Sequence, residues 1–104
     1  MKFHHVGIPT TVQRPGETYL EGGKFSITDA AANPYHIEWL RFDDGSPMPE
    51  PMKAQPHVAF EVDDLRAELA GKSILLEPFA PFPGIEVAFI VEDGALIELM
   101  QRTA

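Results

Sequence analysis

The sequence contains no cysteine, which excludes disulfides, thiolate nucleophiles and metal sites built on Cys ligands. It has no glycine motif of the kind that binds a nucleotide pyrophosphate, so we expect no dinucleotide cofactor. No apolar run approaches the roughly 20 residues that a membrane-spanning helix needs. The segment Met1–His5 lacks the apolar core of a signal peptide, and we therefore expect a soluble, cytoplasmic protein.

Positive charge is also scarce. The chain has 8 Lys and Arg residues against 16 Asp and Glu, which gives a formal net charge of −8. The basic residues form no cluster, so we expect neither a nucleic-acid partner nor an anionic membrane surface. A phosphorylated or CoA-type substrate would have to rely on local positive charge, such as Arg14, Arg41 or a bound metal ion.

The length of 104 residues and the hydrophobic content of 44% predict a single domain over residues 1–104. A domain this small buries a modest share of its surface, so a homodimer is expected as well. Four prolines fall within residues 46–56, and proline cannot serve a central strand ladder. This segment is therefore interpreted as a partly extended connector between half-modules at about residues 1–45 and 56–104.

The second half-module has the predicted order β-α-β-β-β. Asp63 and Asp64 supply a helix cap, Leu65 and Leu69 share one helix face, and Gly71 ends the helix. Glu92-Asp93-Gly94 is typical of a hairpin turn. The strands are expected at residues 57–62, 74–79, 85–91 and 95–101.

The first half-module is a shortened version of the second. Strands are expected at residues 2–8, 24–29 and 35–42, with a loop and at most one helical turn over residues 9–23. HVGI from His5 is similar to HVAF from His57, and HIEWL from His36 is similar to LIELM from Leu96. The first half is shorter by a length that falls where the second half has its helix.

Strand periodicity places candidate functional side chains on one face of each half. Val58 and Phe60 are expected to pack under the helix, while His57 and Ala59 point to the opposite face. In the first strand, Val6 and Ile8 are likewise expected on the core face, and His5 and Gly7 on the other. Each His is followed two positions later by a small residue, which leaves room beside the imidazole.

Two carboxylates have matching positions in the last strand of each half. Glu98 alternates with Ile97 and Leu99, and Glu38 lies between Ile37 and Trp39 in the same way. Two imidazoles and two carboxylates suit zinc or a first-row divalent ion, here Zn, Ni, Co, Mn or Fe. Two further positions of an octahedron would remain for water or for a substrate with two adjacent oxygens. The predicted ligands are His5, Glu38, His57 and Glu98, with Glu98 or Glu38 as the candidate base.

Three segments together resemble a known family. HHVGI near the start, PHVAFEVDDL in the middle and VEDGALIELMQ at the end are similar to motifs of the vicinal oxygen chelate superfamily. This superfamily includes glyoxalase I, methylmalonyl-CoA epimerase, extradiol dioxygenases and metal-free antibiotic-binding proteins. The similarity covers residues 57–101 well, but it covers the first module only at residues 5–8 and 37–40.

The resemblance implies an α+β fold with paired βαβββ modules that form an open, cupped sheet around one metal ion. The first module departs from this pattern because it lacks most of its helix. The set His5, Glu38, His57 and Glu98 matches the family's four ligand positions. It implies a metal-dependent lyase or isomerase of the glyoxalase–epimerase type, acting on a small substrate with vicinal oxygens. The fourth donor argues against the ring-cleaving dioxygenases, which use two His and one carboxylate.

Alternatives remain at individual residues. Either His alone is more often an ordinary half-buried histidine, and a slip in strand register would replace Glu38 by a neighbour such as His36. His36 is an exposed strand residue or a substitute ligand, and Glu61 is a candidate pocket acid. His4 is interpreted as structural, and Trp39 as a core or dimer-interface residue.

Two other functions compete with the enzyme. One is a binding module of the same fold that holds a small apolar or aromatic compound without turnover. The other is a cupin-like or unrelated small β protein in which the His and Glu residues are incidental. The absence of a His-x-His pair argues against a cupin.

Overall fold

A computed structural model describes residues 1–103, which fold into eight strands, two short α-helices and one 3-10 turn. The α+β class predicted from the sequence is therefore confirmed. None of the helices in this part of the chain has the length and apolarity to cross a membrane. In chain order the elements are β1 (Lys2–Pro9), β2 (Thr18–Leu20), β3 (Phe25–Ile27), η1 (Ala30–Ala32), β4 (Ile37–Phe42), α1 (Glu50–Ala54), β5 (His57–Glu61), α2 (Leu65–Leu69), β6 (Ser73–Phe82), β7 (Ile85–Glu92) and β8 (Ala95–Arg102).

The chain divides into two compact units. One unit, called the first unit here, is the continuous stretch His5–Pro56. The second unit combines Met1–His4 with the residues from His57 onward. Strand β1 is thus shared, and its early residue Phe3 packs edge-on against Phe60 of the second unit, with 6.4 Å between ring centroids.

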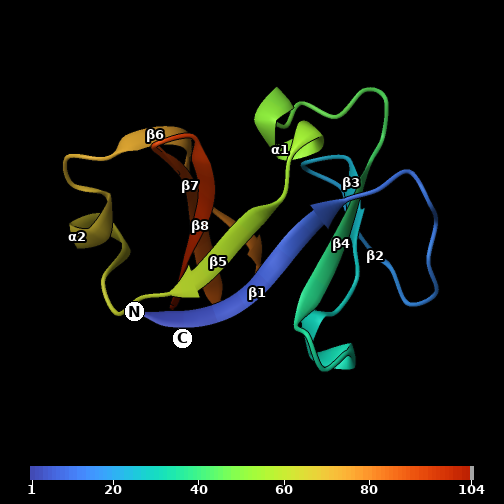
Figure 1. Cartoon of the computed structure of the whole chain (residues 1–104), viewed down its shortest axis with the longest axis horizontal. Helices are drawn as coiled ribbons and strands as arrows, with labels where there is room; N and C mark the ends of the chain where they lie inside the picture. The colour runs from blue at the N-terminus through green and yellow to red at the C-terminus, as the bar shows by residue number, and fades with distance from the viewer. Residues whose placement is uncertain (104) are drawn as a thin grey trace. The chain divides into compact units, whose positions relative to one another are not determined.

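The first unit has the strand order β2-β3-β4-β1 (Figure 1). Strand β1 pairs with β4 in parallel, and β4 pairs with β3 in antiparallel orientation. Phe25 and Phe42 face each other across that antiparallel pair, and their rings stack with centroids 5.0 Å apart. Within this unit, the last strand of the half-module therefore lies beside the first.

The second unit repeats this arrangement with the order β5-β8-β7-β6. Strand β5 pairs with β8 in parallel, and β8 pairs with β7 in antiparallel orientation. The β7–β8 turn contains Asp93 at φ 50° and Gly94 at φ 81°, so both central residues are left-handed, as a type I′ hairpin requires. The hairpin predicted there is confirmed, and the weak sequence repeat corresponds to a repeat of strand pairing.

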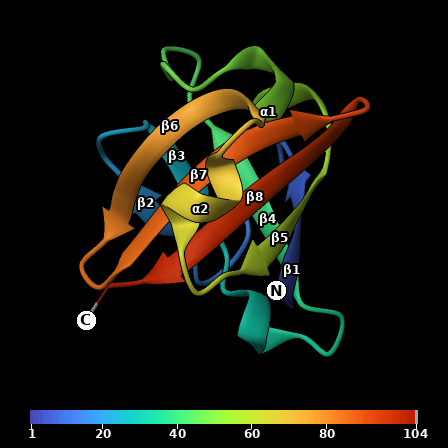
Figure 2. The same cartoon turned by 90° about the vertical axis from the view of Figure 1, so that its left-hand side faces the viewer.

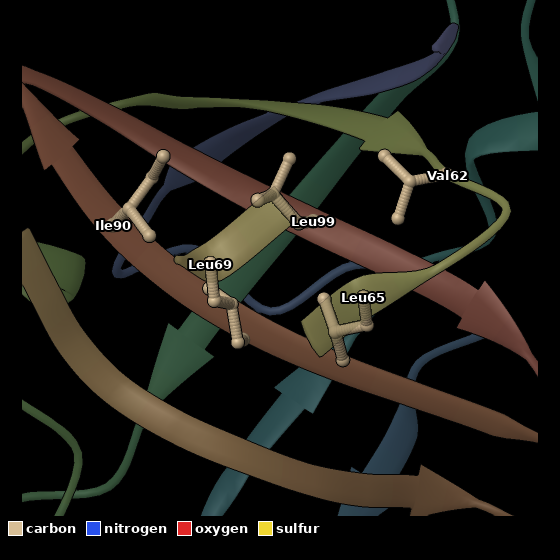
Figure 3. Packing of buried hydrophobic residues seen from close by; sticks show 6 residues of the cluster. Val62, Leu65, Leu69, Ile90 and Leu99 are labelled. Atoms are coloured by element: carbon tan, nitrogen blue, oxygen red, sulfur yellow. The ribbon is translucent and has the colours of Figure 1, made fainter. Parts of the chain in front are cut away.

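The core of the second unit lies between α2 and the sheet. Figure 2 shows α2 over strands β7 and β8, and Figure 3 shows Leu65 and Leu69 beside Val62, Ile90 and Leu99. The Asp64 carboxylate accepts a hydrogen bond from the backbone N–H of Ala67, which caps the helix as expected. The predicted helix and the face it buries are both confirmed.

A loop replaces the helix in the first unit. The Arg14 guanidinium lies 4.2 Å from the centroid of the Trp39 ring, and Arg41 donates two hydrogen bonds to Glu17. These contacts hold residues 14–17 on β4. The burial of β1 differs in degree from the prediction: His5 is buried, whereas Val6, expected on the core face, is half-buried. Strand β5 shows the same pattern, with His57 buried and Val58 half-buried.

Three elements differ from the sequence prediction. Strand β2 lies within the expected loop, where it pairs with β3 despite its three-residue length. The connector contains α1, because Pro51 stands in the first helical turn, where a missing N–H costs no hydrogen bond. Strand β6 continues through Pro78 and Pro81 because it is last in the strand order and its pairing with β7 contains register shifts.

The packing under α2 is testable at Leu65, which is 0% exposed. Leu65→Ala is expected to lower the free energy of unfolding by about 2–5 kcal/mol, because the cavity cannot fully collapse. Ile74→Ala is the control: Ile74 is 39% exposed, so its truncation should cost clearly less. Chemical denaturation monitored by circular dichroism measures both. Equal losses would contradict the assignment of Leu65 to the core.

The ion pair between Glu17 in this loop and Arg41 is tested by the pH dependence of stability. Hydrogen bonding to the Arg41 guanidinium lowers the pKa of Glu17 below its ordinary value of 4.5. A lowered carboxyl pKa adds stability above about pH 4.5 that is lost as the pH falls through the folded-state pKa. Glu17→Gln should therefore destabilise the protein at pH 7, and its effect should decrease as the pH falls below about 4.5. Exposed Glu21→Gln, measured by the same denaturation, should show no such pH-dependent difference.

Candidate metal centre

The first unit brings His5 and Glu38 together from its two parallel strands. The His5 Nε2 atom lies 3.6 Å from the Glu38 Oε1 atom, and the side chains are 2% and 16% exposed. Strand register explains the pairing, because Gly7 is the direct partner of Glu38 across β1 and β4. His5 lies two positions before Gly7 on the same face. The missing side chain of Gly7 leaves space for the imidazole and carboxylate to approach.

The second unit brings His57 and Glu98 together by the same register. The His57 Nε2 atom lies 3.0 Å from the Glu98 Oε1 atom, and the side chains are 1% and 9% exposed. Ala59, two positions after His57, is the direct partner of Glu98 across β5 and β8. In each unit, therefore, a His and a Glu lie on one face of the sheet on either side of a small residue, which is Gly7 in the first unit and Ala59 in the second. Their role as metal ligands stays a prediction.

Phe89 on β7 supports the second pair and was not singled out from the sequence. It is the direct partner of Glu98 across β7 and β8, and it is 3% exposed. Its ring meets the His57 imidazole edge-on, with centroids 5.0 Å apart and planes at 80°. Alternating hydrophobicity over β7 predicts that Phe89 is buried, but only the strand register shows that it contacts His57.

Asn33 fixes the start of β4, and sequence reasoning missed this residue too. Its amide nitrogen donates to the Ile37 carbonyl at 2.9 Å. Its amide oxygen accepts from the N–H groups of Tyr35 and Ile37 at 3.1 and 3.2 Å. Within the turn closed by these three hydrogen bonds, His36 adopts φ 54°, a left-handed conformation that directs the chain into the strand. Because Glu38 follows Ile37, these bonds set where its side chain lies.

The remaining candidates from the sequence lie outside the two pairs. His36 is exposed and precedes β4, so the register places Glu38 rather than His36 beside His5. Glu61 accepts a hydrogen bond from Arg102 Nε at 2.7 Å, which accounts for a residue interpreted as a possible pocket acid. His4 is half-buried, in keeping with a structural role.

The donor types and their burial fit a divalent metal ion. Each pair offers an imidazole and a carboxylate, and both imidazoles are almost fully buried. Imidazole nitrogen and carboxylate oxygen are ordinary ligands of zinc and of first-row divalent ions. A buried carboxylate beside an imidazole is costly without charge compensation, which a cation provides.

Comparisons with known proteins give similarity in fold but not in sequence. No family model and no curated protein sequence matches this chain. A hypothetical protein from Bacillus halodurans C-125 has a similar crystal structure, with a TM-score of 0.65 and 17% identity over 99% of this chain and 95% of that chain. The methylmalonyl-CoA epimerase from Mycobacterium tuberculosis matches with a TM-score of 0.63 and 16% identity over 99% and 89% of the two chains. At these identities the similarity shows a shared fold.

Substitution of Asn33 tests the hydrogen bonds that fix the start of β4 before Glu38. Asn33→Ala removes three hydrogen bonds and should cost about 1–3 kcal/mol of stability. It should also speed hydrogen exchange at the Ile37 amide, which loses its acceptor. Asn33→Asp keeps the acceptor oxygen and should cost less, with slower exchange at Ile37 than in the alanine variant. Unchanged Ile37 exchange in Asn33→Ala would contradict this role.

Proposed function

We propose that this protein is a metal-dependent isomerase or lyase of the glyoxalase–epimerase type, acting on a small substrate with vicinal oxygens. The two pairs, His5–Glu38 and His57–Glu98, are proposed to bind one divalent ion together. The observation that carries this proposal is the repeated register, because a small residue is the direct partner of the Glu in both parallel strand pairs. An incidental His or Glu would not recur with its neighbours in this way.

The fold supports the same class of function. The epimerase from Mycobacterium tuberculosis shares this fold over nearly the whole chain. Fold alone does not define function. The two imidazoles and two carboxylates provide a second, chemical argument for a metal-dependent activity. The absence of Cys leaves His, Asp and Glu as the strong metal ligands available to this chain.

The proposed chemistry is the movement of a proton at carbon. A bound divalent ion would supply Lewis acidity to the two substrate oxygens. A Glu carboxylate, Glu38 or Glu98, takes the proton from the carbon next to a substrate carbonyl. The C–H electron pair shifts toward the carbonyl oxygen, and a carboxylic acid then donates a proton to carbon. Return of the proton by the same carboxylic acid to the neighbouring carbon gives an isomer, once the hydroxyl proton there has moved to the former carbonyl oxygen. Donation to the opposite face by the other Glu, which enters the step protonated while the first Glu keeps the abstracted proton, gives an epimer.

A second candidate is small-molecule binding without turnover. The first unit contains an open cavity of about 740 Å³, within the range of ligand pockets. Ile8 and Phe42 form part of its apolar lining, and Asp43, Glu50 and Lys53 are among its polar residues. The cavity lies near the carboxyl ends of β1 and β4 and lacks the four proposed ligands. Saturable binding that a chelator leaves unchanged would favour this candidate.

The decisive experiment is metal analysis of the native protein and of His57→Ala. Purified untagged protein, reloaded with Zn²⁺, Ni²⁺, Co²⁺ or Mn²⁺ and desalted, is expected to retain about one ion per chain, since the ligands complete one centre. His57→Ala should retain far less, while His36→Ala, an exposed control beside Glu38, should match the native protein. Elemental analysis measures all three.

Activity is tested on the loaded protein. Screening 2-oxo and CoA-thioester substrates in deuterium oxide should reveal solvent deuterium at the carbon next to the carbonyl, and chelation should abolish the exchange. If the native protein retains no metal under any loading condition, the proposed function is wrong. Exchange that survives complete metal removal would contradict the mechanism instead.

A further inference from the structure

The dipeptide Asp-Gly occurs twice in the chain, at Asp44-Gly45 and at Asp93-Gly94. In both places it occupies the two central positions of a turn. An Asp-Gly peptide can rearrange without an enzyme, because glycine has no side chain to shield its backbone nitrogen from the preceding carboxyl group. The two turns therefore allow a comparison in which the reacting residues are the same and only the backbone conformation differs.

The first turn, between β4 and α1, has ordinary backbone geometry. A hydrogen bond from the Ser46 N–H to the Asp43 carbonyl closes it at 3.0 Å, and neither Asp44 nor Gly45 has a positive φ. This combination corresponds to a type I turn, in which the first central residue has a ψ of about −30°. Closure of a ring between the Asp44 carboxyl carbon and the Gly45 nitrogen requires a strongly negative ψ at Asp44, which this turn already approaches.

The second turn is the mirror image of the first and belongs to the β7–β8 hairpin. Asp93 at φ 50° and Gly94 at φ 81° are both left-handed. The first central residue of such a type I′ turn has a ψ of about +30°, farther from the value that ring closure needs. Strand pairing also continues up to the turn, where Glu92 is the direct partner of Ala95. Rotation of the Asp93 backbone would therefore disturb paired strands on both sides.

The reacting groups of the first turn are accessible. Asp44 and Gly45 are both exposed. Among residues 1–103, the Asp44 carboxylate has no hydrogen-bond or ion-pair partner, and no acceptor binds the Gly45 N–H. A Cβ atom at Gly45 would meet nothing within 4 Å, so the space around the attacking nitrogen is open. Neither the carboxyl group nor the amide is held away from the other.

We propose that Asp44-Gly45 is a site of spontaneous isoaspartate formation and that the mirror-image turn protects Asp93-Gly94. The Gly45 nitrogen attacks the Asp44 Cγ atom, an N–C bond forms, and the carboxyl oxygen leaves as water. Water then opens the cyclic imide. Cleavage at Cγ restores aspartate, whereas cleavage at the main-chain carbonyl carbon leaves that carbon as a free carboxylate and routes the backbone through Cβ and Cγ. The steps need no redox partner and are independent of the proposed metal chemistry.

The rearranged turn has one more backbone atom between two anchored ends. At one end, the Tyr19 hydroxyl donates to the Asp43 carboxylate at 2.8 Å. At the other end, the hydroxyl of buried Ser46 donates to the Gly23 carbonyl, and the Ser46 carbonyl accepts from Lys53 of α1 at 2.7 Å. A longer chain between these anchors should break the hydrogen bond from Ser46 to Asp43 and loosen the contact with α1.

The test is peptide mapping of the native protein after incubation in neutral buffer below its unfolding transition, beside the same protein unfolded in denaturant. Electron-transfer fragmentation distinguishes isoaspartate from aspartate at each position. In the unfolded chain both dipeptides should react at similar rates, because their local sequences are alike. In the folded protein Asp44 should convert several-fold faster than Asp93. Equal rates in the folded protein, faster conversion at Asp93, or no conversion at Asp44 would overturn the proposal.

Gly45→Ala is the matched variant. The added methyl group meets no neighbouring atom and the position needs no positive φ, so the fold should be kept while the attack is slowed. Isoaspartate at Asp44 should fall several-fold, with no change at Asp93, and an undiminished rate at Asp44 would contradict the mechanism. If this variant does not fold, the comparison of folded with unfolded native protein still decides the proposal.

The structural consequence is measured by hydrogen exchange. The fraction that contains isoaspartate, separated by ion-exchange chromatography, should exchange the Ser46 amide faster than unmodified protein, because that amide loses its acceptor on Asp43. The Ile90 amide in the strand pairing of β7 is the internal control and should not change. Identical exchange at Ser46 in both fractions would show that the rearrangement leaves the turn intact and would refute the loosening of α1.

Discussion

The parallel pairing of the first and last strand within each half-module is the constraint on which the other features depend. In a parallel ladder, side chains of directly opposed residues lie on the same face. Gly7 beside Glu38 and Ala59 beside Glu98 therefore place each carboxylate next to a His two positions away. A slip of one residue in either ladder would turn the Glu to the other face and break the pair. The same ladders determine which residues of β4 and β8 face the opposite side of the sheet, toward the core.

The two units share this strand ladder but bury the opposite face of their strands in different ways. In the second unit α2 covers it with Leu65 and Leu69, which form a continuous apolar cluster. In the first unit a polar loop covers part of it, with Arg14 stacked on Trp39. The loop uses cation–π and ionic contacts where the helix uses hydrophobic area, and those contacts depend more on solvent conditions. The first unit therefore keeps the site face while its opposite face remains half-exposed.

Local periodicity was sufficient to predict the strands that carry the site, because alternation fixes the face of each residue within a strand. His5, His57 and Glu98 were placed on the face opposite the expected core residues for this reason, and the structure shows that all three are buried there. Phe89 and Asn33 were missed because their roles depend on partners in other segments: Phe89 acts through the β7–β8 register, and Asn33 through a turn. Helix α1 was missed because proline usually excludes a helix but is compatible with its first turn.

The division of β1 between the two units has a consequence for the order in which the chain can fold during synthesis. The first unit is one continuous stretch, so all of its residues are present once Pro56 has been made. The second unit is discontinuous, because Met1–His4 pack with residues that follow His57. Phe3 is thus synthesised before the whole first unit, yet its aromatic partner Phe60 comes only after it. Phe3 can therefore contact Phe60 only after the entire first unit has been synthesised.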